Sequence, residues 1–177
     1  MLEGVDFSSN SLTGNPIGEK FLISAGSVNR LIYNFYWWNY ITRRYKLPEF
    51  GSLYLQINNL NGQIPESPIP NEIGNLLKLE SLDLVENSLS GSIPVAIFNI
   101  STLRMLNLAN NHLSGILPSN MCHGLHNLEY IDLLLNNFSG AIPASISNCS
   151  KLTEIYLGDN KLSVNLHLQN WASSLPS

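Results

Sequence analysis

Carboxylates and tyrosines between residues 83 and 156 have the greatest potential for chemistry in this sequence. Asp83 and Asp132 are a candidate acid–base pair of the kind that hydrolyses glycosidic bonds. Tyr130, Glu154 and Tyr156 combine with Asp132 in a second set, which suits a peptide or protein partner, especially one with a basic group. The two hypotheses require different geometries, so the elements that position these residues decide between them.

Cysteine and histidine suggest metal or disulfide chemistry at one place. Cys122, His123 and His126 form a Cys-His-x-x-His cluster. No fourth ligand follows at a spacing that zinc sites use, so we expect no metal and no cofactor. We expect Cys122 and Cys149 to be buried free thiols, with a disulfide between neighbouring repeats as the alternative.

Three N-x-S/T sequons offer sites for asparagine-linked glycans, at Asn99, Asn137 and Asn148. Three such sequons within one short stretch fit a secreted parent protein. Asn99 and Asn148 are expected on the outer side of the fold, where a glycan has room. Asn137 directly follows Asn136, which the repeat described next makes a turn residue, and is the weaker of the three candidates.

These residues belong to a repeat with the pattern Leu-x-Leu-x-x-Asn-x-Leu, followed by Gly-x-Ile-Pro. Successive asparagines from Asn87 to Asn160 are 24, 25 and 24 residues apart. A longer interval precedes Asn87, where the Pro-rich segment 66–70 adds a bulge in a loop. The turn asparagines of the six copies are Asn10, Asn58, Asn87, Asn111, Asn136 and Asn160.

The period identifies a leucine-rich repeat. Each Leu-x-Leu predicts a short strand with one buried face, and the asparagine turns the chain and satisfies backbone groups that have no sheet partner. Gly and Ile-Pro then begin the return across the outer side. The sequence therefore predicts a right-handed α/β solenoid with parallel strands on the concave face and an irregular or 3-10 convex side, stabilised by stacking of coils.

The outward positions of the predicted strands form three columns on the concave face, where solenoids usually bind partners. Tyr130, Asp132, Leu134, Glu154 and Tyr156 are expected to form one patch, because adjacent strands lie about 4.8 Å apart. Asp83 and Asp132 are two strands apart on a shallow surface that has nothing to raise one carboxyl pKa, so we expect no enzyme. The candidate ligand-binding residues are Tyr54, Asp83, Met105, Asn107, Tyr130, Asp132, Leu134, Glu154 and Tyr156.

The amino-acid composition argues against a nucleic-acid partner. Only 12% of the 177 residues are charged and the net charge is −4, so there is no basic surplus for nucleic-acid phosphates. The start of the chain has no signal-peptide pattern, and no apolar run reaches the 18 residues that would span a bilayer. The sequence by itself thus predicts a chain without an anchor.

The form L-x-x-L-x-L-x-x-N-x-L-S-G-x-I-P, clearest at 89–94 and 138–143, resembles the plant-specific class of leucine-rich repeat. Residues 117–125 resemble the ectodomains of plant leucine-rich-repeat receptor-like kinases. The resemblance implies a parent at the plasma membrane, with this region extracellular, that binds a peptide or protein ligand and a co-receptor in defence or development signalling. It also implies a signal peptide, cysteine caps, a membrane helix and a kinase; this sequence contains none of them.

Two alternatives stay open. One is a free-standing secreted inhibitor that resembles polygalacturonase-inhibiting proteins, although those carry cysteine caps at both ends. The other is a truncated product with no function of its own. In either case the uncapped ends would expose core residues, with Trp171 as a makeshift cover at the C-terminal end.

The repeat pattern divides the chain into four parts. Residues 1–17 are a divergent repeat, 18–50 a non-repeat or degenerate insert, 51–168 the repeats and 169–177 a tail. The aromatic-rich insert is interpreted as misjoined sequence, as a degenerate repeat that turns at Asn34, as a real insertion, or as a membrane-surface anchor too short to span.

Overall fold

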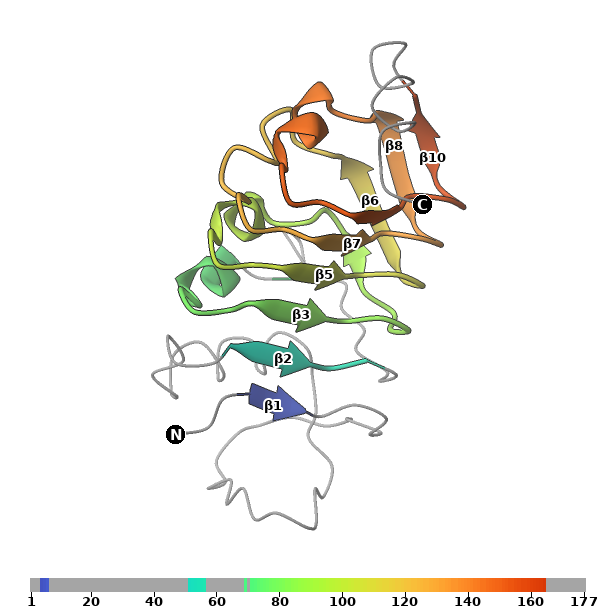
Figure 1. The fold of residues 1–177 in the computed structure, drawn as a ribbon. Helices are drawn as coiled ribbons and strands as arrows, with labels where there is room; N and C mark the ends of the chain where they lie inside the picture. The colour runs from blue at the N-terminus through green and yellow to red at the C-terminus, as the bar shows by residue number, and fades with distance from the viewer. Residues whose placement is uncertain (1–3, 7–50, 57–68, 70, 165–177) are drawn as a thin grey trace.

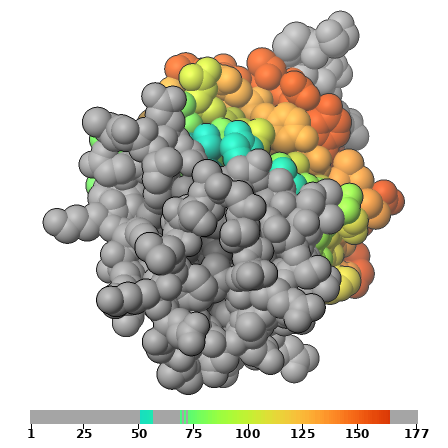
Figure 2. All heavy atoms as spheres, turned by 90° about the horizontal axis from the view of Figure 1, so that it is seen from below, coloured from blue at the N-terminus to red at the C-terminus, as the bar shows by residue number. Residues whose placement is uncertain are grey.

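The computed structural model describes residues 4–6, 51–56, 69 and 71–164, and these form a solenoid of stacked coils with two parallel sheets (Figure 1). Over residues 81–156, each coil runs through a strand of the first sheet, a strand of the second sheet and a convex segment before it returns to the first sheet. Seen from below the view of Figure 1, residues 51–56 (cyan) are visible with the later coils (green to orange) extending beyond them (Figure 2). The predicted right-handed α/β solenoid is confirmed.

The first sheet has six strands in the order β1-β2-β3-β5-β7-β9, and every neighbouring pair is parallel. In β2, β3, β5 and β7 the middle residue is buried and its two neighbours are half-buried, as the Leu-x-Leu pattern predicts. The strands are β1 (Gly4–Asp6), β2 (Ser52–Tyr54), β3 (Ser81–Asp83), β5 (Met105–Asn107), β7 (Tyr130–Asp132) and β9 (Glu154–Tyr156).

The second sheet has four parallel strands in the order β10-β8-β6-β4 and was not predicted from the sequence. It is built largely from the Leu-Ser-Gly segment after each turn asparagine. Short, partly polar segments of this kind do not alternate clearly, so their pairing becomes visible only when the coils stack. The strands are β4 (Ser90–Gly91), β6 (His112–Ile116), β8 (Asn137–Ala141) and β10 (Lys161–Ser163).

The convex side carries short 3-10 helices, which confirms the sequence prediction for this side. In two of them the proline of the Ile-Pro pair is the N-cap, because its restricted φ (−60° at Pro94 and −64° at Pro143) suits the entry into a helical turn. The helices are η2 (Asn71–Asn75), η3 (Val95–Asn99) and η4 (Ala144–Asn148).

A ladder of asparagines, of which Asn87, Asn111 and Asn136 are buried and Asn160 is half-buried, links the coils beneath the first sheet. The Asn111 side chain donates from Nδ2 to the carbonyl oxygens of Leu84, Leu108 and Ala109 at 3.0, 3.2 and 3.1 Å. Its Oδ1 accepts the N–H of Leu89 at 3.0 Å. One amide therefore satisfies groups on its own coil and on the preceding one. The same pattern of three donated bonds recurs at Asn87, Asn136 and Asn160.

The residue before each ladder asparagine adopts a left-handed backbone conformation. Glu86, Asn110, Leu135 and Asp159 have φ between 49° and 54°. Asn and Asp tolerate this region because their side chains bond locally, whereas a leucine gains no such bond and is strained by about 1–2 kcal/mol.

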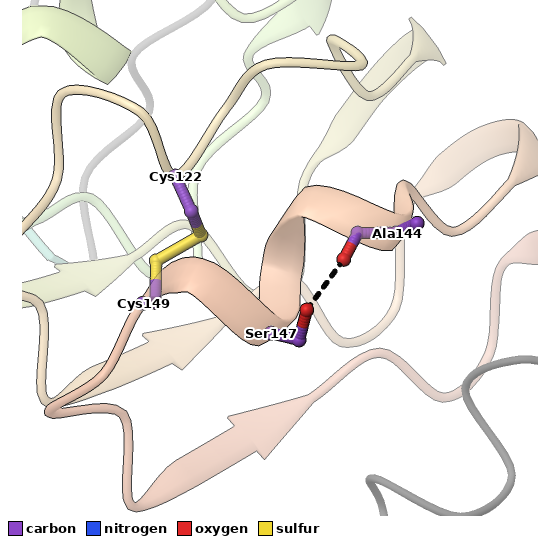
Figure 3. The surroundings of a disulfide bond; sticks show 4 residues. All are labelled: Cys122, Ala144, Ser147 and Cys149. Carbon is purple, nitrogen blue, oxygen red and sulfur yellow. Dashed lines mark hydrogen bonds between the residues drawn. A yellow bond between two sulfur atoms is a disulfide. The ribbon is translucent and has the colours of Figure 1, made fainter.

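Cys122 and Cys149 form a disulfide across two neighbouring coils, so the expectation of free thiols was wrong (Figure 3). Cys149 caps the C-terminal end of η4, and the Cα atoms of the two cysteines are 5.2 Å apart. The convex segment around Cys122 consists of turns rather than a 3-10 helix. The number of residues between each turn asparagine and its cysteine therefore does not show that the two cysteines lie side by side. For this reason the sequence did not reveal the disulfide.

Gly124 explains why this irregular coil still stacks closely. A Cβ atom at residue 124 would overlap the carbonyl oxygen of Phe98 and lie 3.0 Å from the Cα of Asn99. The backbone of this coil thus lies directly against the end of η3, where only glycine fits.

Several sequence predictions concern residues outside the described ranges. Among them are the turn residues Asn10 and Asn58, the insert 18–50 and the tail 169–177 with Trp171. Strands β1 and β2 are direct neighbours in the sheet although residues 7–51 lie between them in the chain. No helix within the described residues has the length and apolar character that crossing a membrane requires.

Candidate functional site

The first sheet aligns the predicted columns as the repeat spacing implied. Asp83 pairs with Asn107, and Asn107 with Asp132, so the two aspartates lie two strands apart with an asparagine between them. Tyr156 extends the same row on β9, and Tyr54 on β2 and Asp6 on β1 continue it at the other end. Met105 is the neighbour of Tyr130 in the adjacent column.

Asp83, Asn107 and Asp132 have a structural task that the sequence analysis did not assign. The Oδ1 atoms of Asp83, Asn107 and Asp132 each accept the backbone N–H two residues further on, at 3.1, 3.2 and 2.9 Å. Each side chain thereby closes an Asx turn at the end of its strand. This repeated bond accounts for the row without catalysis, because an asparagine performs it as well as an aspartate.

Four residues at the end of the sheet form a more specific arrangement, which we call the tyrosine–carboxylate cluster: Tyr130, Asp132, Glu154 and Tyr156. The Tyr130 hydroxyl donates to Oδ2 of Asp132 at 3.1 Å, and the Tyr156 hydroxyl donates to Oε2 of Glu154 at 3.1 Å. The two rings are 5.7 Å apart between centroids and tilted by 50°. The cluster therefore consists of one hydrogen-bonded pair on β7 and one on β9, which meet through the contact of the two rings.

The environment of the cluster keeps both tyrosines protonated. Burial, followed by the charge and the hydrogen bond of Asp132, raises the pKa of Tyr130 from 10.0 to about 12. For Tyr156 the hydrogen bond and charge of Glu154 raise the pKa of the hydroxyl. The hydroxyls therefore stay hydrogen-bond donors.

The cluster is acidic and has no internal counter-charge. Among the described residues, neither Asp132 nor Glu154 forms an ion pair with a lysine or arginine. The nearby cation Arg104 instead pairs with Glu129 at 2.8 Å. Both partners of that pair are exposed, so the pair contributes little to stability.

Apolar residues continue from the cluster along β7. Leu134 is half-buried, as expected for an outward position, and Ala109 on the preceding coil is buried. Leu135 is 50% exposed and was missed by the sequence analysis. The signal in the sequence was weak, because Ile57 stands at the same position before Asn58, and the left-handed turn that makes leucine unusual there is visible only in the structure.

The described residues offer no metal-binding cluster of three or more His, Cys, Asp or Glu side chains. Cys122 is bound in the disulfide, which removes the thiolate of the Cys-His-x-x-His cluster. The sequon asparagines Asn99, Asn137 and Asn148 are all exposed. Asn99 and Asn148 end η3 and η4 on the convex side, and Asn137 begins β8.

Parallel strands on one face, a turn asparagine in each coil and short convex helices together define a leucine-rich-repeat solenoid. The Leucine Rich Repeat family model matches residues 78–100, 102–123 and 127–149, so these segments are leucine-rich repeats. In sequence and fold, the chain resembles the ectodomains of plant leucine-rich-repeat receptor kinases. No curated protein matches the chain.

Three solved structures illustrate this similarity. The Arabidopsis receptor kinase HAESA, in complex with the peptide hormone IDA and the co-receptor SERK1, is 33% identical with a TM-score of 0.63 over 70% of this chain and 20% of that one. The plant peptide hormone receptor RGFR1, in complex with RGF2, is 36% identical with a TM-score of 0.59 over 65% and 18% of the two chains. The BIR3–SERK2 complex from Arabidopsis thaliana is 34% identical with a TM-score of 0.54 over 65% of this chain and 57% of that one. The chain thus spans less than two thirds of the length of each of these structures.

Proposed function

We propose that this chain is a non-catalytic peptide- or protein-binding module and part of the ligand-sensing extracellular region of a plant receptor-like kinase. The observation that carries the proposal is the tyrosine–carboxylate cluster on the open face of the first sheet. Tyr130 is half-buried and Tyr156 is exposed, and tyrosines held in place by hydrogen bonds lose little entropy on binding, which is typical of residues that dominate interfaces.

The solved neighbours support the same assignment. HAESA and RGFR1 were each solved with a peptide hormone, and HAESA also with a co-receptor. By analogy we assign this chain a peptide or protein ligand, with a co-receptor as a second partner. The Asx turns support a non-catalytic role, because they give Asp83 and Asp132 a structural task that requires no perturbed carboxyl pKa.

A peptide-selection experiment tests the binding function. The full chain, secreted from plant cells, is screened against a phage library of random heptapeptides, and the enriched peptides are synthesised and titrated. We expect the double variant Tyr130→Ala with Tyr156→Ala to lose about tenfold or more in affinity. The control, Val95→Ala, alters an exposed side chain on η3 and should bind like the wild type. Equal affinity of all three proteins, or no enriched peptide, would overturn the proposal.

Glycan analysis tests the extracellular assignment separately. Secretion from plant cells should add glycan mass at Asn99 or Asn148, because both are exposed on the convex side, away from the cluster. Replacing both with Gln should remove that mass. Intact mass spectrometry that finds the secreted chain unmodified would argue against an extracellular parent.

A further inference from the structure

We propose that the face formed by β7, β9 and the turns that follow them binds an extended peptide segment with a basic side chain and, two residues along, an apolar side chain. The proposal rests on the binding function above and specifies its ligand. It requires two adjoining subsites of different chemistry, and each is visible in the arrangement of the described residues.

The first subsite is the tyrosine–carboxylate cluster. A guanidinium or ammonium group is attracted both by the faces of aromatic rings and by carboxylates. The Tyr130 and Tyr156 rings, tilted by 50°, offer faces beside two carboxylates that no described lysine or arginine neutralises. Because each tyrosine hydroxyl already donates to a carboxylate, the rings are held in place before a ligand arrives.

The absence of competing positive charge strengthens this assignment. The outward columns of β2, β3, β5, β7 and β9, read over the described residues, contain Asp83, Asp132 and Glu154 but no lysine, arginine or histidine. Their summed formal charge is therefore −3 at neutral pH. Electrostatic complementarity of this sign favours a cationic partner and repels an acidic one.

The second subsite is apolar and lies around Leu134. A Cβ atom built at Gly158 would meet only the Leu134 side chain, at 4.0 Å, so the flank of Leu134 on that coil is open. Leu135, half exposed, continues the apolar surface at the turn. Burying a ligand methyl or isobutyl group here would remove several apolar side chains from water at once.

The distance between the subsites determines the ligand pattern. Asp132 ends β7 and Leu134 lies two residues further along the chain, which corresponds to at most about 7 Å. A bound extended peptide presents its own side chains to one face at the same interval. A basic residue over the cluster therefore places the second residue after it, or before it, over Leu134.

Fluorescence anisotropy with four labelled nonapeptides tests the pattern on the full chain. In a Gly-Ser background, the probes carry Arg-Ser-Leu, citrulline-Ser-Leu, Arg-Ser-Ser and citrulline-Ser-Ser. Citrulline keeps the shape of arginine without its charge. We expect Arg-Ser-Leu to bind about tenfold tighter than either single replacement. Equal affinity of the four probes, or no binding of Arg-Ser-Leu at about 1 mM, would overturn the inference.

Two matched variants assign the subsites. Asp132→Asn with Glu154→Gln should abolish the preference for Arg over citrulline and keep that for Leu over Ser, since Asn preserves the Asx turn. Gly158→Val should keep the preference for Arg over citrulline and abolish that for Leu over Ser, because the new side chain has room and covers Leu134. The control Val95→Ala should change neither, and thermal unfolding verifies that each variant is folded. Loss of both preferences in a folded single-subsite variant would contradict the assignment.

The two proposals can fail separately. If the heptapeptide selection yields ligands that depend on Tyr130 and Tyr156 but lack the basic–apolar pattern, the binding function stands and this inference falls. If the selection yields no ligand and the Arg-Ser-Leu probe does not bind, both fall.

Discussion

The two sides of the strands in the first sheet differ in how they use repetition. On the inner side, the ladder asparagines Asn87, Asn111, Asn136 and Asn160 make nearly the same hydrogen bonds in every coil. On the outer side, the column that holds Ser81 and Met105 in two coils holds Tyr130 and Glu154 in the next two. The inner side is constrained by stacking, whereas variation on the outer side leaves the fold intact.

This difference teaches where stability and recognition lie in the molecule. A residue that bonds to two coils at once cannot change without disturbing both. A residue on the open face touches few neighbours, so its identity is free to follow a ligand. The predictions below test this division, beginning with the largest expected effect.

Removal of one ladder amide should have the largest effect. Asn111→Ala leaves the buried N–H of Leu89 without its side-chain partner and removes one of the two amide hydrogen bonds to the carbonyl oxygen of Leu84. We expect the free energy of unfolding to fall by about 3 kcal/mol or more, measured by urea denaturation. The control Asn120→Ala removes an exposed side chain and should change it by less than about 0.5 kcal/mol. Similar losses in the two variants would remove the distinction between the two sides.

The disulfide should come next in size. Replacing Cys122 and Cys149 together with Ser opens a link between residues 27 apart in sequence, and we expect a loss of about 2–4 kcal/mol in thermal or urea unfolding. Adding a reducing agent to the wild type should reproduce the loss of stability. The same agent should not change the stability of the double variant, which has no disulfide. Because the bond lies on the convex side, peptide affinity should stay the same; a large affinity loss in the folded variant would link the two faces.

A substitution at Leu135 is expected to raise the free energy of unfolding, by less than the two preceding changes lower it. Leu135→Asn relieves a leucine held at φ 54° and should stabilise the protein by about 1 kcal/mol. The reciprocal variant Asn110→Leu, at φ 52°, should destabilise it by a similar amount. Both are read from the midpoint of urea unfolding. A loss of stability in Leu135→Asn would mean that the exposed leucine serves packing rather than recognition.

The smallest expected effect on stability concerns pH. The folded pKa of Tyr130, about 12, lies above its ordinary 10.0, so the unfolded chain loses this proton first as the pH rises. The stabilisation is fully present below pH 10 and is lost between about pH 10 and 12. Tyr130→Phe should flatten this part of the stability curve. A spectroscopic titration that finds Tyr130 ionising at its ordinary pKa would contradict the cluster geometry.

The repeat made most of the first sheet predictable from the sequence. Leu82, Leu106 and Ile131 recur at a constant interval, and a period-two strand with one buried face has one register that buries them all. The same register brought Tyr130 beside Glu154, and Asp132 beside Tyr156, as predicted. The ladder role of the asparagines was likewise predictable, because a buried turn leaves backbone groups that need an amide partner.

Other features could not be predicted because they depend on how one coil lies against the next. The second sheet, the Cys122–Cys149 bond and the close contact of Gly124 with η3 each join residues of neighbouring coils on a path whose length varies from repeat to repeat. In these segments the number of residues after the turn asparagine does not predict where a residue lies in the coil, since one added residue shifts all those that follow.

The sequence alone therefore determined the class of fold, the strand register and the residues available on the open face, because a strict hydrophobic period admits a single way of stacking. Only the tertiary structure decided which of those residues act together. It joined Tyr130 to Asp132 and Tyr156 to Glu154, used Asp83 and Asn107 to close turns, and left Leu135 strained and exposed. The physical reason is that hydrogen bonds and packing act over a few ångströms, whereas a repeat pattern specifies only which strands are neighbours.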